Sequence, residues 1–307
     1  MKIFDAHCDV LSQMLKYRGI SFQSGSSLHI TYEQLLNTGS KVQCFAIFVS
    51  PSIHPMMRFQ AAIEMIDIFY EKILAPNPEM KLILNRADIF SLKENEIGAV
   101  LTLEGCEAIQ EDLIKLNTLY RLGVRSVGLT WNFANAVADG AMESRGGGLT
   151  QFGRQTVERL NQLGIWTDVS HLSEKAFWDV LQLAEHPIAS HSNPYTLCPH
   201  PRNLRDHQIK ALIERDSVIG ITFVPEFVVK DGNANIKDIL KLVEYICSLG
   251  GVGNIGFGSD FDGIDKTVNG LSSYKDYASL VNELVKHYTS EQVEGFLFYN
   301  FAERFPQ

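Results

Sequence analysis

Phe4-Asp5-Ala6-His7-Cys8-Asp9 is the stretch that decides how this chain of 307 residues folds. It lies in a short β-rich run, residues 2–9. Successive side chains of a strand point to opposite faces, so His7 and Asp9 should project from the same face. An imidazole beside a carboxylate at a strand end supplies half of a divalent-metal site. The stretch therefore predicts a fold that gathers strand ends around one site.

Seven further β-rich runs follow, with helical patterns between most of them. The runs span residues 41–50, 97–104, 124–131, 165–171, 187–191, 218–225 and 254–261. The helical patterns span residues 56–74, 112–122, 151–163, 174–184, 206–215 and 236–249, and two amphipathic stretches follow at 274–286 and 290–305. Strands that alternate with helices in this way predict an eight-stranded parallel β/α (TIM) barrel. No glycine-rich phosphate loop follows the first run, and we expect residues 1–307 to form a single domain.

Polar residues recur where the predicted strands end, the edge at which barrel enzymes build their active sites. They are His7, Asp9, Glu104, His171, His191 and Asp260. Nitrogen and oxygen ligands without a thiolate suit one or two zinc-like ions at a hydrolytic site, and a carboxylate such as Glu104 can bridge two ions. Taken singly, each residue has a structural interpretation. His171 would be a hydrogen-bonded histidine of the core or surface, Asp260 would cap a following turn, and Glu104 would be an ordinary acidic residue of a loop. Their coincidence at predicted strand ends favours a shared metal centre.

The neighbours of these residues have structural interpretations. Cys8 should point away from His7, into the layer between strands and helices, while Asp5 lies deeper and should support the ligands. The remaining histidines fall in predicted helices or loops, where we expect structural roles: His29, His54, His186, His200, His207 and His287. Two predicted helix starts carry capping residues, Ser173 before Glu174 and Thr289 before Ser290.

Composition excludes several classes of protein. The formal net charge of −9 argues against a nucleic-acid surface and offers no polybasic membrane patch. No apolar run is long enough to span a membrane. The five cysteines are scattered, which is neither a disulfide framework nor a pair of CxxC zinc clips. We expect a cytoplasmic protein that binds neither nucleic acid nor membrane.

Six motifs resemble, in order and spacing, those of the renal (membrane) dipeptidase family of zinc metallopeptidases. They are Phe4-Asp5-Ala6-His7-Cys8-Asp9, Leu103-Glu104-Gly105, Asp168-Val169-Ser170-His171, Ser190-His191-Ser192, His200-Pro201-Arg202-Asn203 and Gly256-Phe257-Gly258-Ser259-Asp260-Phe261-Asp262-Gly263. The resemblance covers nearly the whole chain, as far as Asn300. It implies a barrel of the metal-dependent hydrolase type, two zinc ions and dipeptides as substrates.

The resemblance also implies a role for each matching residue. His7, Asp9 and the bridging Glu104 would hold one zinc ion, while Glu104, His171 and His191 would hold the other. Asp260 would contact the substrate and shuttle a proton from the bridging hydroxide, which attacks the peptide carbonyl, to the leaving amine. Asp260 and Glu104 are thus the expected catalytic residues. Arg202 would bind the terminal carboxylate of the dipeptide, and a C-terminal D-residue should be tolerated.

One position departs from the family pattern. Trp131, in Leu129-Thr130-Trp131-Asn132, stands where the renal enzyme has a histidine that contacts the substrate. An indole donates one hydrogen bond but cannot carry a charge near neutral pH. We expect Trp131 to contact the substrate, either as a donor or as a wall of the pocket, with packing at the barrel mouth as the alternative. We also expect a soluble, bacterial-type member of the family without leader, lipid anchor or intersubunit disulfide. Whether the chain forms a homodimer is left undecided by the sequence.

Other functions remain open from the sequence. Deaminases and lactonases are also binuclear-metal barrel hydrolases, but they often bridge their ions with a carbamylated lysine, and this chain offers Glu104 instead. A small-molecule binding protein without catalysis is a weaker alternative, and no repeat or basic surface indicates a partner-binding role. Arg202 could also be a surface residue that pairs with Asp206 or Glu214.

Overall fold

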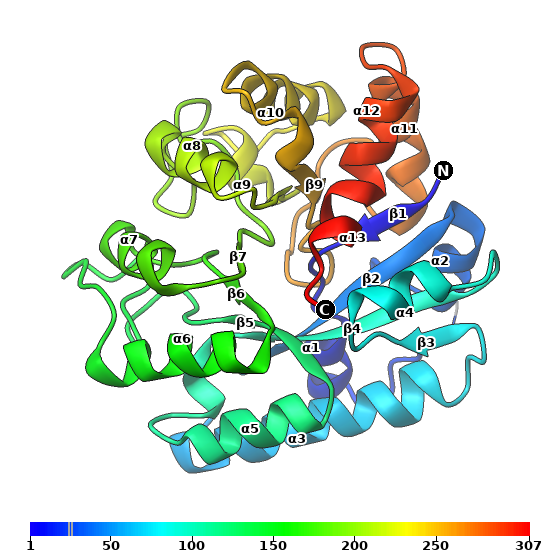
Figure 1. Ribbon diagram of the computed structural model, residues 1–307. Helices are drawn as coiled ribbons and strands as arrows, with labels where there is room; N and C mark the ends of the chain where they lie inside the picture. The colour runs from blue at the N-terminus through cyan, green and yellow to red at the C-terminus, as the bar shows by residue number, and fades with distance from the viewer. Residues whose placement is uncertain (24, 26) are drawn as a thin grey trace.

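The computed structural model describes residues 1–23, 25 and 27–307, and its centre is a ring of parallel strands (Figure 1). The strands are β1 (Ile3–Asp5), β2 (Ser40–Phe48), β4 (Ile97–Glu104), β5 (Val124–Gly128), β6 (Trp166–Asp168), β7 (Pro187–Ile188), β8 (Ile219–Ile221) and β9 (Ile255–Phe257). They pair in the order β7-β6-β5-β4-β2-β1-β9-β8, and a parallel bridge between Ala189 and Ile219 joins the two ends of that order. The predicted eight-stranded parallel β/α barrel is confirmed.

The predicted strands exist, but most of them end earlier than the β-rich runs do. The run at residues 2–9 forms β1 only as far as Asp5, so His7 and Asp9 follow the strand and do not belong to it. The cause is a side chain: Asp5 Oδ1 accepts the amide N–H of Ser259 at 2.8 Å and that of His7 at 3.3 Å. The carboxylate thus replaces regular ladder bonds. The expectation that strand alternation aligns His7 with Asp9 is therefore wrong, although both reach the site.

Helices cover the outside of the barrel (Figure 1). Those that the sequence predicted are α3 (Arg58–Ile68), α5 (Leu113–Arg121), α6 (Gln151–Leu163), α7 (Glu174–Leu183), α8 (Asp206–Glu214), α10 (Ile236–Ser248), α11 (Tyr277–Leu284), α12 (Ser290–Glu294) and α13 (Asn300–Arg304). A π-helical segment, η6 (Gly295–Tyr299), joins α12 to α13. The two predicted caps are present, because Ser173 and Thr289 accept backbone N–H groups in the first turns of α7 and α12.

Four short helices and one strand were not predicted. They are α1 (Val10–Lys16), α2 (Tyr32–Thr38), α4 (Arg86–Ser91), α9 (Pro225–Val228) and β3 (Met80–Leu82), which pairs with β4 outside the ring. Elements this short give too few periods for a pattern to be detected. None of the helices in the described ranges is long and apolar enough to cross a membrane.

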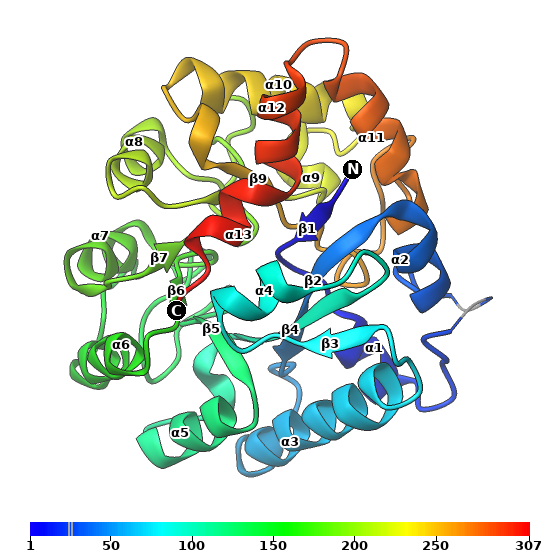
Figure 2. The same cartoon turned by 45° about the vertical axis from the view of Figure 1, so that its right-hand side comes forward.

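Aromatic side chains close the N-terminal end of the barrel. Phe301 of α13 stacks on Phe4 of β1 with ring centroids 5.3 Å apart, and Phe305 lies against Trp166 of β6 at 4.6 Å. Figure 2 shows α13 lying across the middle of this end. All four rings are buried, so this end is a packed hydrophobic plug. The opposite end, where the strands point, is left for polar side chains.

Candidate metal centre

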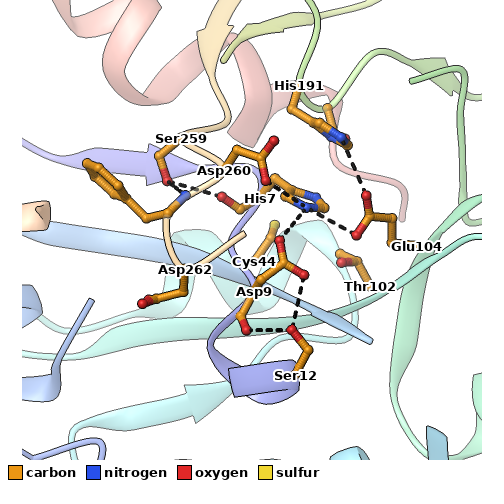
Figure 3. Close-up of polar contacts among 12 residues, drawn as sticks. His7, Asp9, Ser12, Cys44, Thr102, Glu104, His191, Ser259, Asp260 and Asp262 are labelled. Atoms are coloured by element: carbon orange, nitrogen blue, oxygen red, sulfur yellow. Dashed lines mark hydrogen bonds and ion pairs between the residues drawn. The ribbon is translucent and has the colours of Figure 1, made fainter. Parts of the chain in front are cut away.

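The six polar residues predicted at strand ends come together at the C-terminal end of the barrel. Glu104 is the last residue of β4, and the others follow β1, β6, β7 and β9 within a few residues. Figure 3 shows His7, Asp9, Glu104, His191 and Asp260 with their side chains facing one another. His171 joins them through His191, since the two Nε2 atoms lie 2.8 Å apart. The sequence prediction of a shared cluster is thus matched by the geometry.

One half of the cluster surrounds His7. Its Nε2 atom lies 3.3 Å from Asp9 Oδ2, 3.5 Å from Glu104 Oε2 and 3.9 Å from Asp260 Oδ1. This nitrogen is buried and has no hydrogen-bond partner in the described part of the chain. A buried polar atom without a partner costs free energy, and here it faces carboxylate oxygens from three directions. That donor set suits a divalent cation.

The other half surrounds the second oxygen of Glu104. Glu104 Oε1 lies 2.9 Å from His171 Nε2 and 3.7 Å from His191 Nε2. Glu104 therefore directs one carboxylate oxygen to each half of the cluster, which is the arrangement of a carboxylate that bridges two ions.

The hydrogen bonds of His171 test whether a cation fits. His171 Nδ1 lies 2.9 Å from Asn132 Oδ1, an amide oxygen that only accepts, so the ring hydrogen is on Nδ1. The Nε2 atom then presents a lone pair to Glu104 Oε1, which also only accepts. Two acceptors at 2.9 Å repel each other unless a cation or a proton lies between them. The residues of this half fit a zinc ion.

Burial of so many titratable groups shifts their pKa values. Burial raises the pKa of Asp260 to about 7, with Asp9 and Glu104 adding to the shift and His7 opposing it. Burial lowers the pKa of His171 to about 3, helped by the charge of Arg202. A metal ion is the largest local charge in such a site and favours ionised carboxylates and neutral imidazoles. Without a cation, burial disfavours the ionised form of Asp260, and a cation bound here would favour that form again.

Two cavities meet at His171. The first, of about 230 Å³, is lined among others by Asp9, Glu104, Trp131, His171 and Asp260, and we call it the Trp131 cavity. The second, of about 210 Å³, is lined among others by His171, Tyr195 and Arg202, and we call it the Arg202 cavity. A small molecule bound at the cluster can therefore extend to either side of His171.

Arg202 is buried beside the cluster. Arg202 is only 3% exposed, and its Nε has no hydrogen-bond partner among the described residues. Its Nη2 donates one long hydrogen bond of 3.4 Å to the carbonyl oxygen of His191. The alternative of a surface residue paired with Asp206 or Glu214 is wrong, because Arg202 is buried, and Asp206 accepts hydrogen bonds from Thr196 and Tyr245. Arg202 thus holds unused donors beside the Arg202 cavity.

Trp131 lies at the mouth of the first cavity. Its ring is 5.2 Å from that of Phe48, at an angle of 55°, and 6.4 Å from the His171 ring. Both aromatic residues are half-buried and line the Trp131 cavity. Trp131 therefore presents an aromatic face to this cavity.

Several supporting residues were not singled out from the sequence. Asn132 and Ser190 contact the Nδ1 atoms of His171 and His191, and Asp168 accepts hydrogen bonds from Ser190. Asp168 and Ser190 stand within the motifs of His171 and His191, whereas Asn132 follows Trp131 and carries no such signal. Asp5, which was expected to support the ligands, holds the His7 amide. Cys8 packs in the strand–helix layer, as predicted.

The backbone at the site is unusual. His171 and Asp260 have φ angles of 68° and 63°, in the left-handed region that few residues other than glycine adopt. Such conformations cost free energy and persist where the surrounding structure enforces them, often at functional sites.

The barrel and its cluster of buried histidines and carboxylates define a metal-dependent hydrolase. The family model described as Membrane dipeptidase (Peptidase family M19) matches residues 1–306, so the chain belongs to this family of metallopeptidases. The family suggested by the six motifs is confirmed, and the chain is a metallo-dipeptidase, which sets aside the deaminase, lactonase and non-catalytic alternatives.

Relatives agree over the length of the chain. An uncharacterised dipeptidase of Schizosaccharomyces pombe is 29% identical over 326 residues, which cover 97% of this chain and 78% of that protein. The solved structure of a metallopeptidase named dipeptidase AC has a TM-score of 0.93 and 25% identity, covering 99% of this chain and 97% of that one. A metallopeptidase from Rhodobacter sphaeroides, solved with a phosphinate mimic of L-Ala-D-Ala, shows the same fold, with a TM-score of 0.93, 24% identity and coverage of 99% and 98%.

Proposed function

We propose that this metallo-dipeptidase holds two zinc ions and hydrolyses the peptide bond of dipeptides, including those with a C-terminal D-residue. The observation that carries the proposal is the placement of Glu104. One of its oxygens lies 3.5 Å from His7 Nε2 and the other lies 2.9 Å from His171 Nε2. A single carboxylate thus serves two groups of ligands.

The ligands divide between two positions. His7, Asp9 and Glu104 hold one zinc ion, and Glu104, His171 and His191 hold the other. When bound, a pair of zinc ions supplies a hydroxide nucleophile at neutral pH and polarises the carbonyl of the substrate.

Asp260 is the residue that moves the proton. Its carboxylate borders the Trp131 cavity and lies 3.9 Å from His7 Nε2, so it faces the place where the nucleophile is formed. A carboxylate in that position can accept a proton from the nucleophile and deliver it to the leaving amine. The left-handed backbone at Asp260 aims this side chain into the site.

Arg202 selects dipeptides by their free carboxylate. Its guanidinium is buried beside the Arg202 cavity and has an Nε without a partner in the described ranges. A planar guanidinium matches a carboxylate with two parallel hydrogen bonds. A longer peptide would place a neutral amide there, so the C-terminal residue of a dipeptide belongs in the Arg202 cavity.

Trp131 contacts the N-terminal residue in the other cavity. Its ring and that of Phe48 form a half-buried aromatic surface. This favours the interpretation that Trp131 is a wall of the pocket and not a hydrogen-bond donor to the substrate. Because removing apolar surface from water lowers the free energy, dipeptides with an apolar N-terminal side chain should bind best.

A panel of peptides with the zinc-loaded enzyme tests the proposal. It compares L,L- and L,D-dipeptides with tripeptides and dipeptide amides, and the L-Ala-D-Ala mimic bound by the Rhodobacter sphaeroides enzyme motivates the L,D pairs. We expect turnover of both kinds of dipeptide and little turnover of the others. Equal turnover of tripeptides would contradict the role of Arg202, and failure on every L,D-dipeptide would contradict the tolerance of D-residues.

A further inference from the structure

We propose that Asp168 and Ser190 form a relay that fixes the tautomer of His191 in which Nε2 is free to bind metal, an inference that rests on the proposed ligand role of His191. His191 Nδ1 lies 2.6 Å from Ser190 Oγ, and Ser190 Oγ in turn is in contact with Asp168 Oδ2. Ser190 contacts the far side of the His191 ring, at Nδ1, and Asp168 contacts Ser190, so neither residue touches the Nε2 atom that would bind metal. They are positioning residues, because they act through His191.

A count of hydrogens decides the direction of the relay. Asp168 Oδ1 accepts the backbone N–H groups of Ser170 and Ser190, each at 2.9 Å, so this carboxylate acts as an acceptor. The single hydroxyl hydrogen of Ser190 therefore goes to Asp168 Oδ2. Ser190 Oγ can then only accept, both from the Ser170 hydroxyl 3.4 Å away and from His191 Nδ1, which places the ring hydrogen on Nδ1. Nε2 is left with its lone pair, directed at His171 Nε2 2.8 Å away.

The surroundings keep the relay intact. Asp168, Ser190 and His191 are 6%, 3% and 1% exposed, so water does not compete for these hydrogen bonds. Ser170 has a different role, because its hydroxyl accepts the backbone N–H of His191 at 3.1 Å and holds the main chain, not the ring. Asp168 ends β6 and pairs with Ile188, the last residue of β7 and two residues before Ser190, so the relay spans two adjacent strands.

The two imidazoles of this half of the cluster are supported differently. His171 Nδ1 donates to Asn132, a neutral amide, whereas His191 Nδ1 donates through a hydroxyl to a carboxylate. A carboxylate behind an imidazole raises its basicity as a metal ligand, and removing such a partner costs about 10- to 100-fold in metal affinity. The relay therefore makes His191 the stronger of the two ligands.

The test combines nitrogen-15 NMR of histidine in the metal-free protein with zinc titration against a competing chelator, neither of which needs a substrate. We expect wild-type His191 to carry its hydrogen on Nδ1. Ser190→Ala should shift the ring toward the other tautomer and weaken zinc binding by about 10- to 100-fold, while Ser190→Thr, which keeps the hydroxyl, should restore both. In Asp168→Asn the new amide N–H₂ group can donate to Ser190 Oγ. The Ser190 hydroxyl should then donate to His191 Nδ1, which reverses the tautomer and leaves the ring hydrogen on Nε2.

Ser217→Ala is the matched control. Ser217 is 4% exposed and donates its hydroxyl to the carbonyl of Pro187 at 2.5 Å, so the variant also loses a buried hydroxyl, but far from the ligands. Its zinc affinity and its His191 tautomer should equal those of the wild type. Wild-type His191 protonated on Nε2, or equal zinc affinities of Ser190→Ala and Ser217→Ala, would overturn the relay. The wild-type measurement stands even if a variant fails to fold. Failure of the wild type to bind zinc would instead count against the proposed function.

Discussion

Replacing Arg202 with methionine removes a buried guanidinium and keeps an unbranched side chain. In the free enzyme the guanidinium makes one 3.4 Å hydrogen bond to the His191 carbonyl oxygen, and its Nε has no partner in the described part of the chain. Few hydrogen bonds of the free enzyme are therefore lost, although the contact of the guanidinium with the Phe227 ring, 5.6 Å from its centroid, is also removed. With a dipeptide bound, two charge-assisted hydrogen bonds to the substrate carboxylate disappear, which costs about 2–4 kcal/mol. The corresponding loss in kcat/KM is about 30- to 1000-fold.

The assay measures kcat/KM for a dipeptide and for its C-terminal amide, each with wild type and Arg202→Met. The amide lacks the carboxylate, so it should already be a poor substrate and should lose much less on mutation. The four values form a double-mutant cycle that isolates the coupling between Arg202 and the carboxylate. Zinc content is measured in parallel, because Arg202 donates to the backbone of His191. Equal losses on the acid and the amide would refute the assignment.

Arg205→Met provides the matched control for this loop. Arg205 Nε lies 2.9 Å from Glu174 Oε2, and the two side chains are 46% and 49% exposed. Arg205 also lines the Arg202 cavity, but its charge is paired and exposed, and exposed ion pairs contribute little, so this variant should change kcat/KM by less than about threefold on either substrate. A loss as large as that of Arg202→Met would show that the loop, and not the buried guanidinium, is responsible.

Three further substitutions test the proposed roles. Glu104→Gln should weaken both metal positions, because an amide is a poorer, uncharged ligand; full zinc occupancy with normal turnover would exclude a bridging carboxylate. Asp260→Asn should keep the zinc content but lower kcat by about 10²- to 10⁴-fold, since the amide cannot carry the proton; an unchanged kcat would remove Asp260 from proton transfer. Trp131→Phe should preserve most of kcat and alter KM or side-chain preference if the ring is a wall. A loss of about 10²-fold or more in kcat would instead identify the indole N–H as a donor to the transition state.

Periodicity carried most of the fold prediction. The helical pattern at residues 151–163 coincides with α6, and each of the eight β-rich runs overlaps one strand of the ring. What periodicity could not show is where a strand stops. β1 ends at Asp5 because its carboxylate accepts an N–H from Ser259, a contact between residues 254 positions apart. No local pattern contains that information.

The site was predictable for a different reason. In a parallel barrel all strand ends face the same way, so polar residues near those ends converge even when a boundary is misplaced by a few residues. The burial of Arg202 was not predictable in this way, since its loop carries no periodic signal and an arginine is usually exposed. The hydrogen bonds of Asn132 and Ser190 depend on how neighbouring strands lie in space, which no local pattern specifies.

Three of the proposed ligands are held by residues that are not themselves proposed ligands. Asp5 holds the backbone of His7, Asn132 holds the ring of His171, and Ser190 holds the ring of His191. Each contact fixes a ligand without using the atom that would bind metal. The remaining cost is electrostatic, because unpartnered lone pairs and carboxylates are brought together in a buried place. Bound cations would relieve that cost, and ligands whose orientation is already fixed spend less of the binding free energy on rearrangement.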